Sequence, residues 1–415
     1  MAKAALETGI LETAGDAPPS PRWEEDALGF LIAPVARDEF LGRYYEREAV
    51  INIRDEPDRY ADLLTLAALD HFLASADLRE GMVDVTNHRN RIERESYIDD
   101  GGRVSRAAIA EEYLRGATII LPQFHESMFK LGEFCRALEE VFSCHMQTNI
   151  YLTPRSEDGT GNQGFPPHYD NHDVFVLQIS GAKAWRIYGT PVATPFRGEQ
   201  FEIGRHEAGP VTREFTLKAG DCLYLPRGLM HDAENVGDEP SLHITAGLIT
   251  KTWADLLLES ISELALTAPD FRRSLPAGFA NRDFDREAAR KQFDKLAKLI
   301  SKEAGMDSAF DLLADNFLRG RRPNVSGVIA ASAAAPRPED RYRRRRFVPW
   351  NVADDDGKLV LIGPGGDLDF LAEDGDALDV ALSGAPFSAA DLPCEKPEDL
   401  IRTLWAGGYL ERVTS

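Results

Sequence analysis

Hydrophobic residues between positions 147 and 250 come in short runs, which Gly, Pro and Asp interrupt at short intervals. The runs are rich in Val, Ile, Phe, Tyr and Thr, the residues that favour strands. They cover residues 150–153, 174–179, 184–188, 222–225 and 242–245. This rhythm predicts an antiparallel β-sandwich or barrel over this part of the chain.

The N-terminal part of the chain follows a different pattern. Residues 1–21 are small and polar and end in Pro-Pro-Ser-Pro, which predicts a loose tail. Residues 22–150 mix helical spacing with short strands. Asp38 is expected to cap one of these helices, and residues 50–53 are expected to form a strand.

Residues 251–322 change to helical periodicity. The helices expected there cover residues 253–266, 285–304 and 307–318. Residues that share a face of the first helix are Leu256, Leu257, Ile261 and Leu264. Asp285 and Asp307 stand where N-caps of the other two helices would be. Three helices appended to a sheet domain predict a small bundle or a dimer contact.

The C-terminal region divides once more. Residues 323–340 are rich in Pro, Ala and Ser, as in a linker. Residues 341–415 contain a strand-like run at 358–362 and a final amphipathic helix that begins at Pro397, a favoured first-turn residue. This arrangement predicts a small winged-helix-like domain. The pattern as a whole predicts an α+β chain whose β-rich core lies within residues 22–250.

Composition narrows the class of protein. A chain of 415 residues suggests two or three domains, and 43% hydrophobic with 28% charged residues is a globular balance. The net charge of −22 argues against a protein that coats nucleic acid through its overall field. Four cysteines without a C-x-x-C pair, no secretory signal and no membrane-length apolar run predict a cytoplasmic protein.

Candidate metal ligands stand at two places in the β-rich region. His168 and Asp170 lie two residues apart, so in a strand they would present an imidazole and a carboxylate on one face. Residues 220–235 then have the form G-x5-P-x-G-x2-H-x3-N, which resembles the second motif of the cupin barrels and offers His231. Two histidines and one carboxylate are the ligand set of non-haem Fe(II) oxygenases.

An H-x-D pair alone is usually a pair of polar surface residues, so the prediction depends on the second motif. Together the two motifs favour a metal site with mixed nitrogen and oxygen ligands. With no thiolate among them, such ligands suit iron or manganese better than a structural zinc site.

Lys183 is a candidate for binding an anion. Its parity places it on one face of a strand with Trp185 and Ile187, which would turn the ammonium into the barrel. A buried Lys needs an anionic partner, which a dicarboxylate would supply. Tyr151 and Asn149 lie on the preceding strand and could bind the same anion. The alternatives are a solvated Lys183 and a Tyr151 that belongs to the core.

Several segments together resemble the JmjC-type cupin family, which includes the bacterial and mammalian ribosomal oxygenases. They are residues 149–154, 166–170, 173–178, 181–188 and the His231 motif. The resemblance covers most of the chain. It implies a double-stranded β-helix (cupin or jelly-roll) core with N-terminal α/β elements, a helical dimerisation domain at 251–322 and a winged-helix-like domain at 341–415.

The resemblance also implies an activity. Members use Fe(II), O2 and 2-oxoglutarate to hydroxylate an arginine or histidine side chain of a ribosomal protein. By this resemblance His168, Asp170 and His231 would bind iron, and Lys183 would bind the distal carboxylate of 2-oxoglutarate with Tyr151 and Asn149 assisting. The expected protein is a homodimeric hydroxylase with a ribosomal-protein substrate, no membrane partner and no direct nucleic-acid partner.

Three alternatives remain open at this point. The segment between Pro154 and His168 is longer than in the family and would border the site, so a peptide or a small natural product is a second possible substrate. Demethylation of a protein uses the same chemistry. The basic run 341–346 could instead belong to a non-catalytic cupin with a nucleic-acid-binding tail, although a solvated linker end fits it better. Among the other histidines, His172 is the one placed to face Asp170.

Overall fold

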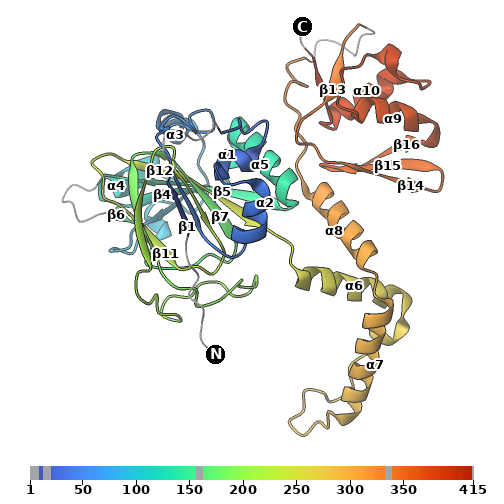
Figure 1. Cartoon of the computed structure of the whole chain (residues 1–415), viewed down its shortest axis with the longest axis horizontal. Helices are drawn as coiled ribbons and strands as arrows, with labels where there is room; N and C mark the ends of the chain where they lie inside the picture. The colour runs from blue at the N-terminus through green and yellow to red at the C-terminus, as the bar shows by residue number, and fades with distance from the viewer. Residues whose placement is uncertain (1–8, 13–19, 156–161, 332–338, 414–415) are drawn as a thin grey trace. The chain divides into compact units, whose positions relative to one another are not determined.

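The computed structural model describes residues 9–12, 20–155, 162–331 and 339–413. The chain divides into two compact units, residues 1–250 and residues 251–415. Figure 1 labels the elements of both.

Two β-sheets form the core of the first unit (Figure 1). The larger sheet has the strand order β1-β2-β10-β7-β12-β5-β4-β3, and the smaller has the order β6-β11-β8-β9. The strands of the larger sheet are β1 (Gly9–Glu12), β2 (Val50–Ile53), β3 (Asp84–Thr86), β4 (Thr118–Pro122), β5 (His145–Thr153), β7 (Asp173–Ser180), β10 (Cys222–Leu225) and β12 (Ser241–Ile249). Those of the smaller sheet are β6 (Asn162–Gln163), β8 (Ala182–Ile187), β9 (Arg213–Lys218) and β11 (His231–Asn235).

From β5 to β12 the chain passes repeatedly between the two sheets, as in a double-stranded β-helix, so the predicted jelly-roll core is confirmed. The space between the sheets is filled by side chains that alternate inward along each strand. Val174 and Val176 of β7 belong to one buried cluster with Trp185 and Ile187 of β8. The sequence parity that placed Trp185 and Ile187 inward is therefore correct.

The N-terminal elements cover the larger sheet and differ from the sequence predictions in two places. Gly9–Glu12 forms β1, which pairs in parallel with β2, where a loose tail was predicted. Asp38 is not a cap: it lies in the first turn of α2 (Arg37–Glu39), which continues into a π-helical turn at Phe40–Tyr44. An aspartate is favourable both at the N-cap and in the first turn of a helix, so the sequence pattern could not distinguish these two positions.

The remaining helices of this unit are short, apart from one. They are α1 (Ala27–Ile32), α3 (Leu66–Ser75), α4 (Arg106–Leu114) and α5 (Phe129–Phe142), with single turns at Arg94–Ser96 and Phe124–Glu126. The long helix, α5, buries Leu131, Phe134 and Leu138. Thr65 and Ser105 cap α3 and α4 through their side-chain oxygens, as helix N-termini favour.

The second unit begins with three helices, α6 (Trp253–Thr267), α7 (Glu287–Glu303) and α8 (Met306–Gly320), and a short turn at Pro269–Arg272. Thr252 forms a capping box with Asp255 at the start of α6. The predicted aspartate caps of the other two helices are wrong: Arg286 and Gly305 stand at the cap positions, and Asp307 lies inside α8. The predicted face of α6 holds only in part, because Leu256 and Leu264 are buried but Leu257 is exposed.

The rest of the second unit contains two small sheets and two helices. Its elements are β13 (Tyr342–Arg344), β14 (Asn351–Asp355), β15 (Lys358–Gly363), β16 (Gly366–Leu371), α9 (Gly375–Leu382), α10 (Pro397–Ala406) and β17 (Leu410–Arg412), with single turns at Ala372–Asp374 and Ala389–Asp391. Pro397 opens α10, as predicted. Leu378, Leu404 and Tyr409 are among the buried residues of one hydrophobic cluster there.

The basic run 341–346 is engaged within its own unit. Arg343 pairs with Glu411 on the neighbouring strand at 2.6 Å. Arg341 donates to the carbonyl of Pro386 at 3.0 Å, and Arg345, which is buried, donates to the carbonyl of Ser326. These contacts favour a structural role for the run.

Three of the four cysteines are buried, and none forms a disulfide. Burial raises the pKa of the Cys144 thiol to about 12 and that of the Cys222 thiol to about 11. The thiols of Cys135, Cys144 and Cys222 are therefore protonated at neutral pH. None of the described helices combines the length and the apolar character needed to cross a membrane.

Candidate metal centre

His168 and His231 are brought together by their own backbones. The backbone amide of His168 donates to the carbonyl oxygen of His231 at 3.0 Å. The backbone amide of His231 donates in return to the carbonyl oxygen of His168 at 2.8 Å. This reciprocal pair is a single antiparallel bridge, and it places the two imidazole centroids 4.6 Å apart. His231 opens β11, as predicted, but His168 and Asp170 lie outside the named strands and were wrongly placed on one strand.

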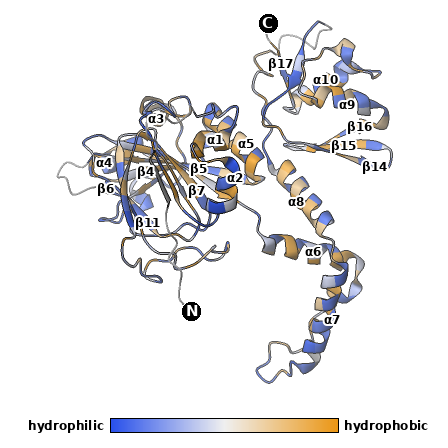
Figure 2. Ribbon diagram, viewed as in Figure 1, coloured by the Kyte–Doolittle hydropathy of each residue, from blue (hydrophilic) through white to orange (hydrophobic). Residues whose placement is uncertain are grey.

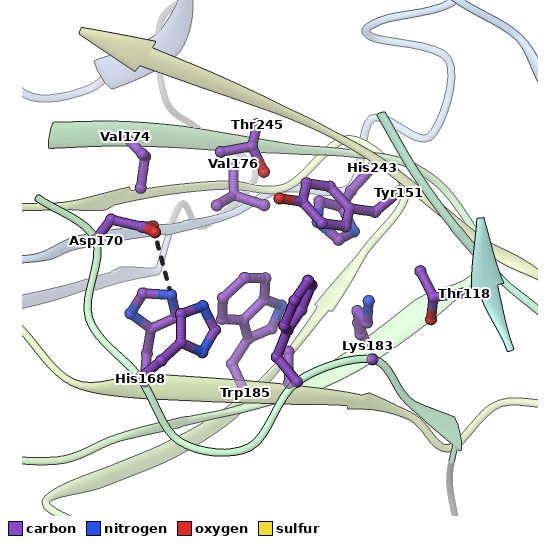
Figure 3. Close-up of a pocket in the computed structure, with 14 residues that line it drawn as sticks. Thr118, Tyr151, His168, Asp170, Val174, Val176, Lys183, Trp185, His243 and Thr245 are labelled. Carbon is purple, nitrogen blue, oxygen red and sulfur yellow. Dashed lines mark ion pairs between the residues drawn. The ribbon is translucent and has the colours of Figure 1, made fainter. Parts of the chain in front are cut away.

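Asp170 completes the group. The nearest ligand atoms of His168, Asp170 and His231 all lie within 4.8 Å of one another, and Asp170 Oδ2 is 3.8 Å from His231 Nε2 (Figure 3). Two imidazole nitrogens and one carboxylate oxygen at these separations form a possible metal site. The three sequence candidates thus meet at one point.

The hydrogen bonds of the two imidazoles fix which nitrogen faces the site. Nδ1 of His168 lies 2.9 Å from the carbonyl oxygen of Pro166, and Nδ1 of His231 lies 3.0 Å from that of Leu229. A carbonyl can only accept, so each Nδ1 carries the proton. Each Nε2 then keeps a lone pair, the form in which histidine binds metals when its other nitrogen donates to the backbone.

The protonation states of the group suit a cation. Burial, and after it the neighbouring His168, lower the pKa of His231 to about 4, so its imidazole is neutral at pH 7. Burial would raise the pKa of Asp170, but His231 and His168 outweigh it and leave that pKa below its usual value. The neutral imidazole of His231 therefore faces an ionised carboxylate.

A tight turn presents His231 and also holds Asp170. Gly228 has φ +86°, a left-handed conformation, and its amide donates to the carbonyl of Asp170 at 2.9 Å. A Cβ at Gly228 would lie 2.0 Å from the carbonyl oxygen of Val192. Both the conformation and the crowding therefore require glycine here.

The group lies at one end of a pocket of about 60 Å³ between the two sheets (Figure 3). A water molecule needs roughly 10–15 Å³ by this measure, so there is room for several water-sized groups. The lining residues outside the metal group are Thr118, Tyr151, Gly164, Phe165, Val174, Val176, Lys183, Trp185, Ala233, His243 and Thr245.

Lys183 lines this pocket and is only 4% exposed. Its Nζ donates to Oγ1 of Thr153 at 3.2 Å, and none of the described carboxylates pairs with it. Burial lowers the pKa of Lys183 to about 7. A buried ammonium bonded to one neutral hydroxyl is a strong attractor for an anion, as the sequence parity had predicted.

Tyr151 and Asn149 take different positions. Tyr151 lines the pocket, and its ring stacks on His243 with centroids 4.8 Å apart and planes within 6°. Burial raises the pKa of Tyr151 strongly, so its hydroxyl stays protonated. Asn149 shares the β5 face of Tyr151 but is not among the residues that line the pocket.

Sequence reasoning missed His243 and Thr245 of β12. They alternate inward, the same parity signal that placed Lys183, but their segment had been interpreted only as a strand. Nδ1 of His243 and Nε1 of Trp185 are buried and have no hydrogen-bond partner among the described residues. These unpaired polar atoms mark the pocket as a place for a polar ligand.

Two other features lie apart from this pocket. His172 does not line it; the ring lies against Gly247, where a Cβ would be 2.5 Å from His172 Cδ2. Residues 156–161 of the long segment before His168 lie outside the described residues. Beyond them, Asn162 and Gln163 form β6, and Gly164 and Phe165 line the pocket.

Comparison with known proteins agrees with this arrangement. Residues 123–256 match the JmjC domain family. Ribosomal oxygenase 1 of Gallus gallus is 34% identical over 336 residues, which cover 76% of this chain and 54% of that protein. Residues 123–256 thus resemble a JmjC domain, and the chain is similar over most of its length to ribosomal oxygenase-like proteins.

The names of other relatives include two activities, demethylation and hydroxylation. The bifunctional lysine-specific demethylase and histidyl-hydroxylase NO66 of Culex quinquefasciatus is 32% identical over 72% of this chain and 48% of its own. The chain thus spans about half the length of these two curated relatives. A structure of YcfD, a ribosomal oxygenase from Escherichia coli, in complex with cobalt and 2-oxoglutarate, aligns at 13% identity with a TM-score of 0.49, covering 92% of this chain and 99% of that one.

We expect Gly228→Ala to destabilise the protein by more than about 2 kcal/mol, because left-handed strain of roughly 1–2 kcal/mol adds to a backbone clash. Gly204→Ala is the matched control, since Gly204 has φ +82° but no atom within 4 Å of an added Cβ. Urea denaturation measures both free energies of unfolding. Equal losses for the two variants would contradict the role given to crowding at Gly228.

Proposed function

We propose that the protein is an Fe(II)- and 2-oxoglutarate-dependent oxygenase that hydroxylates an amino-acid side chain of a protein, most plainly an arginine or histidine of a ribosomal protein. The observation that carries the proposal is the pairing of two sites in one pocket. His168, Asp170 and His231 form a cation site, and Lys183 supplies a buried ammonium that lacks an anion among the described residues.

The donors fit the metal. In this proposal Nε2 of His168, Nε2 of His231 and the carboxylate of Asp170 hold Fe(II), since mixed nitrogen and oxygen donors without thiolate suit that ion. The Nδ1 contacts with Pro166 and Leu229 orient the two rings before the metal arrives. Asp170 supplies the negative charge that partly offsets that of the cation.

The other end of the pocket fits a dicarboxylate. Lys183 would take one carboxylate of 2-oxoglutarate, with the hydroxyl of Tyr151 as a second donor and Asn149 in support, as the family resemblance implies. His243, neutral because burial and then Lys183 lower its pKa, adds no competing positive charge. Val174, Val176 and Trp185 exclude water from the space between the two ends.

With O2, the iron and 2-oxoglutarate supply the oxidising chemistry, and the net change is R–H, O2 and 2-oxoglutarate to R–OH, CO2 and succinate. The chain itself binds, orients and shields these groups. His168 and Asp170 also line a neighbouring groove of about 290 Å³ with Phe165 and Phe201, which offers a path for the substrate side chain.

The names of the relatives motivate the substrate proposal. They include ribosomal oxygenase and histidyl-hydroxylase, but also lysine-specific demethylase. A peptide or a small natural product remains the alternative that the long segment before His168 motivates. The contacts of the 341–346 run support the catalytic proposal over a non-catalytic protein with a nucleic-acid-binding tail. The cytoplasmic location and the separate winged-helix-like domain at 341–415 remain predictions.

Ribosomal proteins from cells that produce the unsubstituted chain are expected to differ by the mass of one oxygen atom from those of cells that produce Asp170→Ala. Iron-dependent succinate release should fall more than about 100-fold in the variant, beyond what loss of a contact outside the ligand set costs. Intact-protein mass spectrometry measures the first effect and a succinate assay the second. Loss of methyl groups instead would favour demethylation, and unchanged ribosomal proteins would favour a peptide or small molecule.

Binding of 2-oxoglutarate is expected to weaken with rising pH. The pKa of Lys183 is about 7 in the free pocket, and a bound carboxylate would raise it. Above pH 7 the pocket must therefore take up a proton on binding, and affinity should fall about tenfold per pH unit. Calorimetric titration with Co(II) present, from pH 6 to 9, measures this dependence.

Two variants separate the charge of Lys183 from its titration. Lys183→Arg keeps a charge that does not titrate, so its affinity should not follow this slope. Lys183→Met keeps the length but no charge, and should bind weakly at every pH. A slope that persists in Lys183→Met would show that another group titrates.

Dimerisation through residues 251–322 is the second part of the proposal. Helix α6 exposes large apolar side chains, among them Trp253 at 72%, Leu257 at 56% and Leu266 at 76%, and Figure 2 shows the hydrophobic residues along α6 and α8. Exposed apolar residues that are gathered on neighbouring elements are typical of protein interfaces.

The unsubstituted chain is expected to sediment as a dimer. Leu257→Asp together with Leu266→Asp should shift it to a monomer, because charges at an apolar interface lose their hydration. Leu114→Asp is the control, since Leu114 is 83% exposed on α4 of the other unit. Sedimentation velocity distinguishes these states, and a monomeric unsubstituted chain would contradict the proposal.

A further inference from the structure

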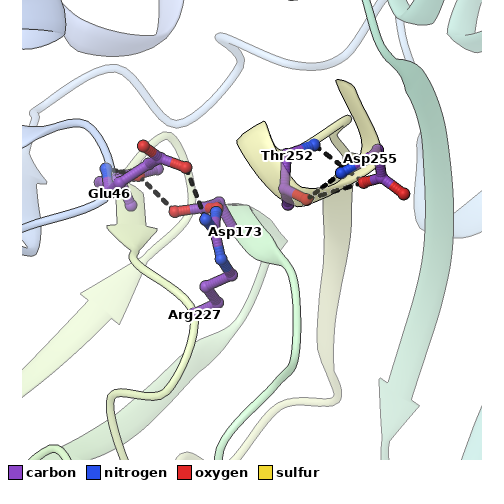
Figure 4. A network of polar contacts seen from close by, with 6 residues as sticks. Glu46, Asp173, Arg227, Thr252 and Asp255 are labelled. Atoms are coloured by element: carbon purple, nitrogen blue, oxygen red, sulfur yellow. Dashed lines mark hydrogen bonds and ion pairs between the residues drawn. The ribbon is translucent and has the colours of Figure 1, made fainter. Parts of the chain in front are cut away.

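A buried ion pair involves residues close in the sequence to the metal ligands but outside that group: Asp173 follows Asp170, and Arg227 precedes His231. Arg227 Nη1 donates to Asp173 Oδ2 at 2.5 Å, and its Nη2 pairs with Glu46 Oε1 at 2.6 Å (Figure 4). The hydroxyl of Tyr224 donates to the other oxygen of Asp173 at 2.7 Å. Both oxygens of this carboxylate are therefore satisfied.

The two ion pairs of Arg227 differ in their surroundings. The side chain of Asp173 is fully buried and that of Arg227 is 9% exposed, whereas that of Glu46 is 40% exposed. An exposed ion pair contributes little to the stability of the folded protein. Removing one partner of a buried ion pair strongly destabilises the protein, because the other charge is left buried alone. The contact of Arg227 with Asp173 is therefore the more important of its two ion pairs for the stability of the fold.

The position of this pair in the chain relates it to the metal ligands. Asp173 is the first residue of β7 and follows the loop that carries His168 and Asp170. Arg227 lies in the turn between β10 and β11, which presents His231. Strands β10 and β7 are neighbours, with Leu225 opposite Val174, so the pair lies where the two ligand-bearing segments leave the sheet.

Several contacts among the described residues join these two segments, and three of them are hydrogen-bonded. The backbones of His168 and His231 bond to each other, Gly228 donates to the carbonyl of Asp170, and the side chains of Arg227 and Asp173 form the third contact. The first two contacts involve only backbone atoms. Arg227 and Asp173 form a side-chain contact between the end of the Asp170 loop and the start of the His231 turn.

We propose that Arg227 and Asp173 are positioning residues of the metal centre, which hold the Asp170 loop and the His231 turn at the separation that metal binding requires. The inference rests on the proposed function, because it assigns this pair a role toward the same metal. Without the pair, the three ligands remain in the protein, but their two segments lose the side-chain contact that supplements the backbone bonds between them.

The test uses the full chain and Co(II) as the probe. The variants are Arg227→Met, Asp173→Asn, the double variant and Arg227→Lys, with Glu46→Gln as the control that removes only the outer, exposed pair. Calorimetry gives the Co(II) affinity, visible absorption reports the Co(II) coordination, and urea denaturation gives the stability of the metal-free protein. Metal affinity and coordination are readouts that a purely structural role would leave unchanged once stability is restored.

Arg227→Met is expected to weaken Co(II) binding about 10- to 100-fold, the range found when residues that orient ligands are lost. The double variant should recover stability, because neither charge is left buried alone, yet keep the weakened affinity and the altered spectrum. Arg227→Lys should bind more tightly than Arg227→Met, and Glu46→Gln should bind within about twofold of the unsubstituted chain.

A double variant with unsubstituted Co(II) affinity and spectrum would overturn the inference and leave the proposed function intact. If neither the double variant nor Arg227→Met folds, Asp173→Asn decides: an affinity equal to that of the unsubstituted chain, with an unchanged spectrum, would overturn the inference. Absence of Co(II) binding by the unsubstituted chain would overturn the proposed function, and the inference with it.

Discussion

The candidate site depends on one pair of backbone hydrogen bonds, those between His168 and His231. They join a loop and a strand that are far apart in the sequence, and they do so without any side chain. Because the bonds fix both Cα positions, the imidazoles need only the correct rotamer to face each other, and the carbonyls of Pro166 and Leu229 select it. A site of this kind is organised before a ligand arrives, so little ordering entropy is lost on binding.

Buried charged side chains of the barrel differ in whether they have an oppositely charged partner. Asp173 meets Arg227 and Tyr224, and this carboxylate is fully matched by its own fold. Among the residues that the structure describes, the Lys183 ammonium donates a hydrogen bond only to the hydroxyl of Thr153. A buried charge with an ion-pair partner helps to hold one fixed structure. A buried charge without such a partner lowers the stability of the ligand-free protein, and binding of an anion removes this loss of stability. The contrast separates residues that build the pocket from residues that receive a ligand.

Much of the barrel could be predicted from the sequence because strand parity is a strict period of two. It correctly placed Lys183, Trp185 and Ile187 inward, and the Pro-x-Gly turn correctly placed His231 at the start of a strand. Parity failed for His168 and Asp170, whose segment is held by one bridge and not by a ladder. Asp307 was misplaced because carboxylates favour both the cap and the first turn of a helix. The contact between His243 and Tyr151 depends on the register of two distant strands, which local pattern does not contain.

The buried cysteines have a consequence for a protein that would handle O2 beside iron. Only the thiolate reacts readily with oxidants, and burial keeps Cys135, Cys144 and Cys222 as thiols. Cys222 lies on β10 opposite Leu177 of β7, the strand whose Val174 and Val176 line the pocket. Burial therefore keeps these three sulfur atoms in the protonated form, which reacts slowly with oxidants.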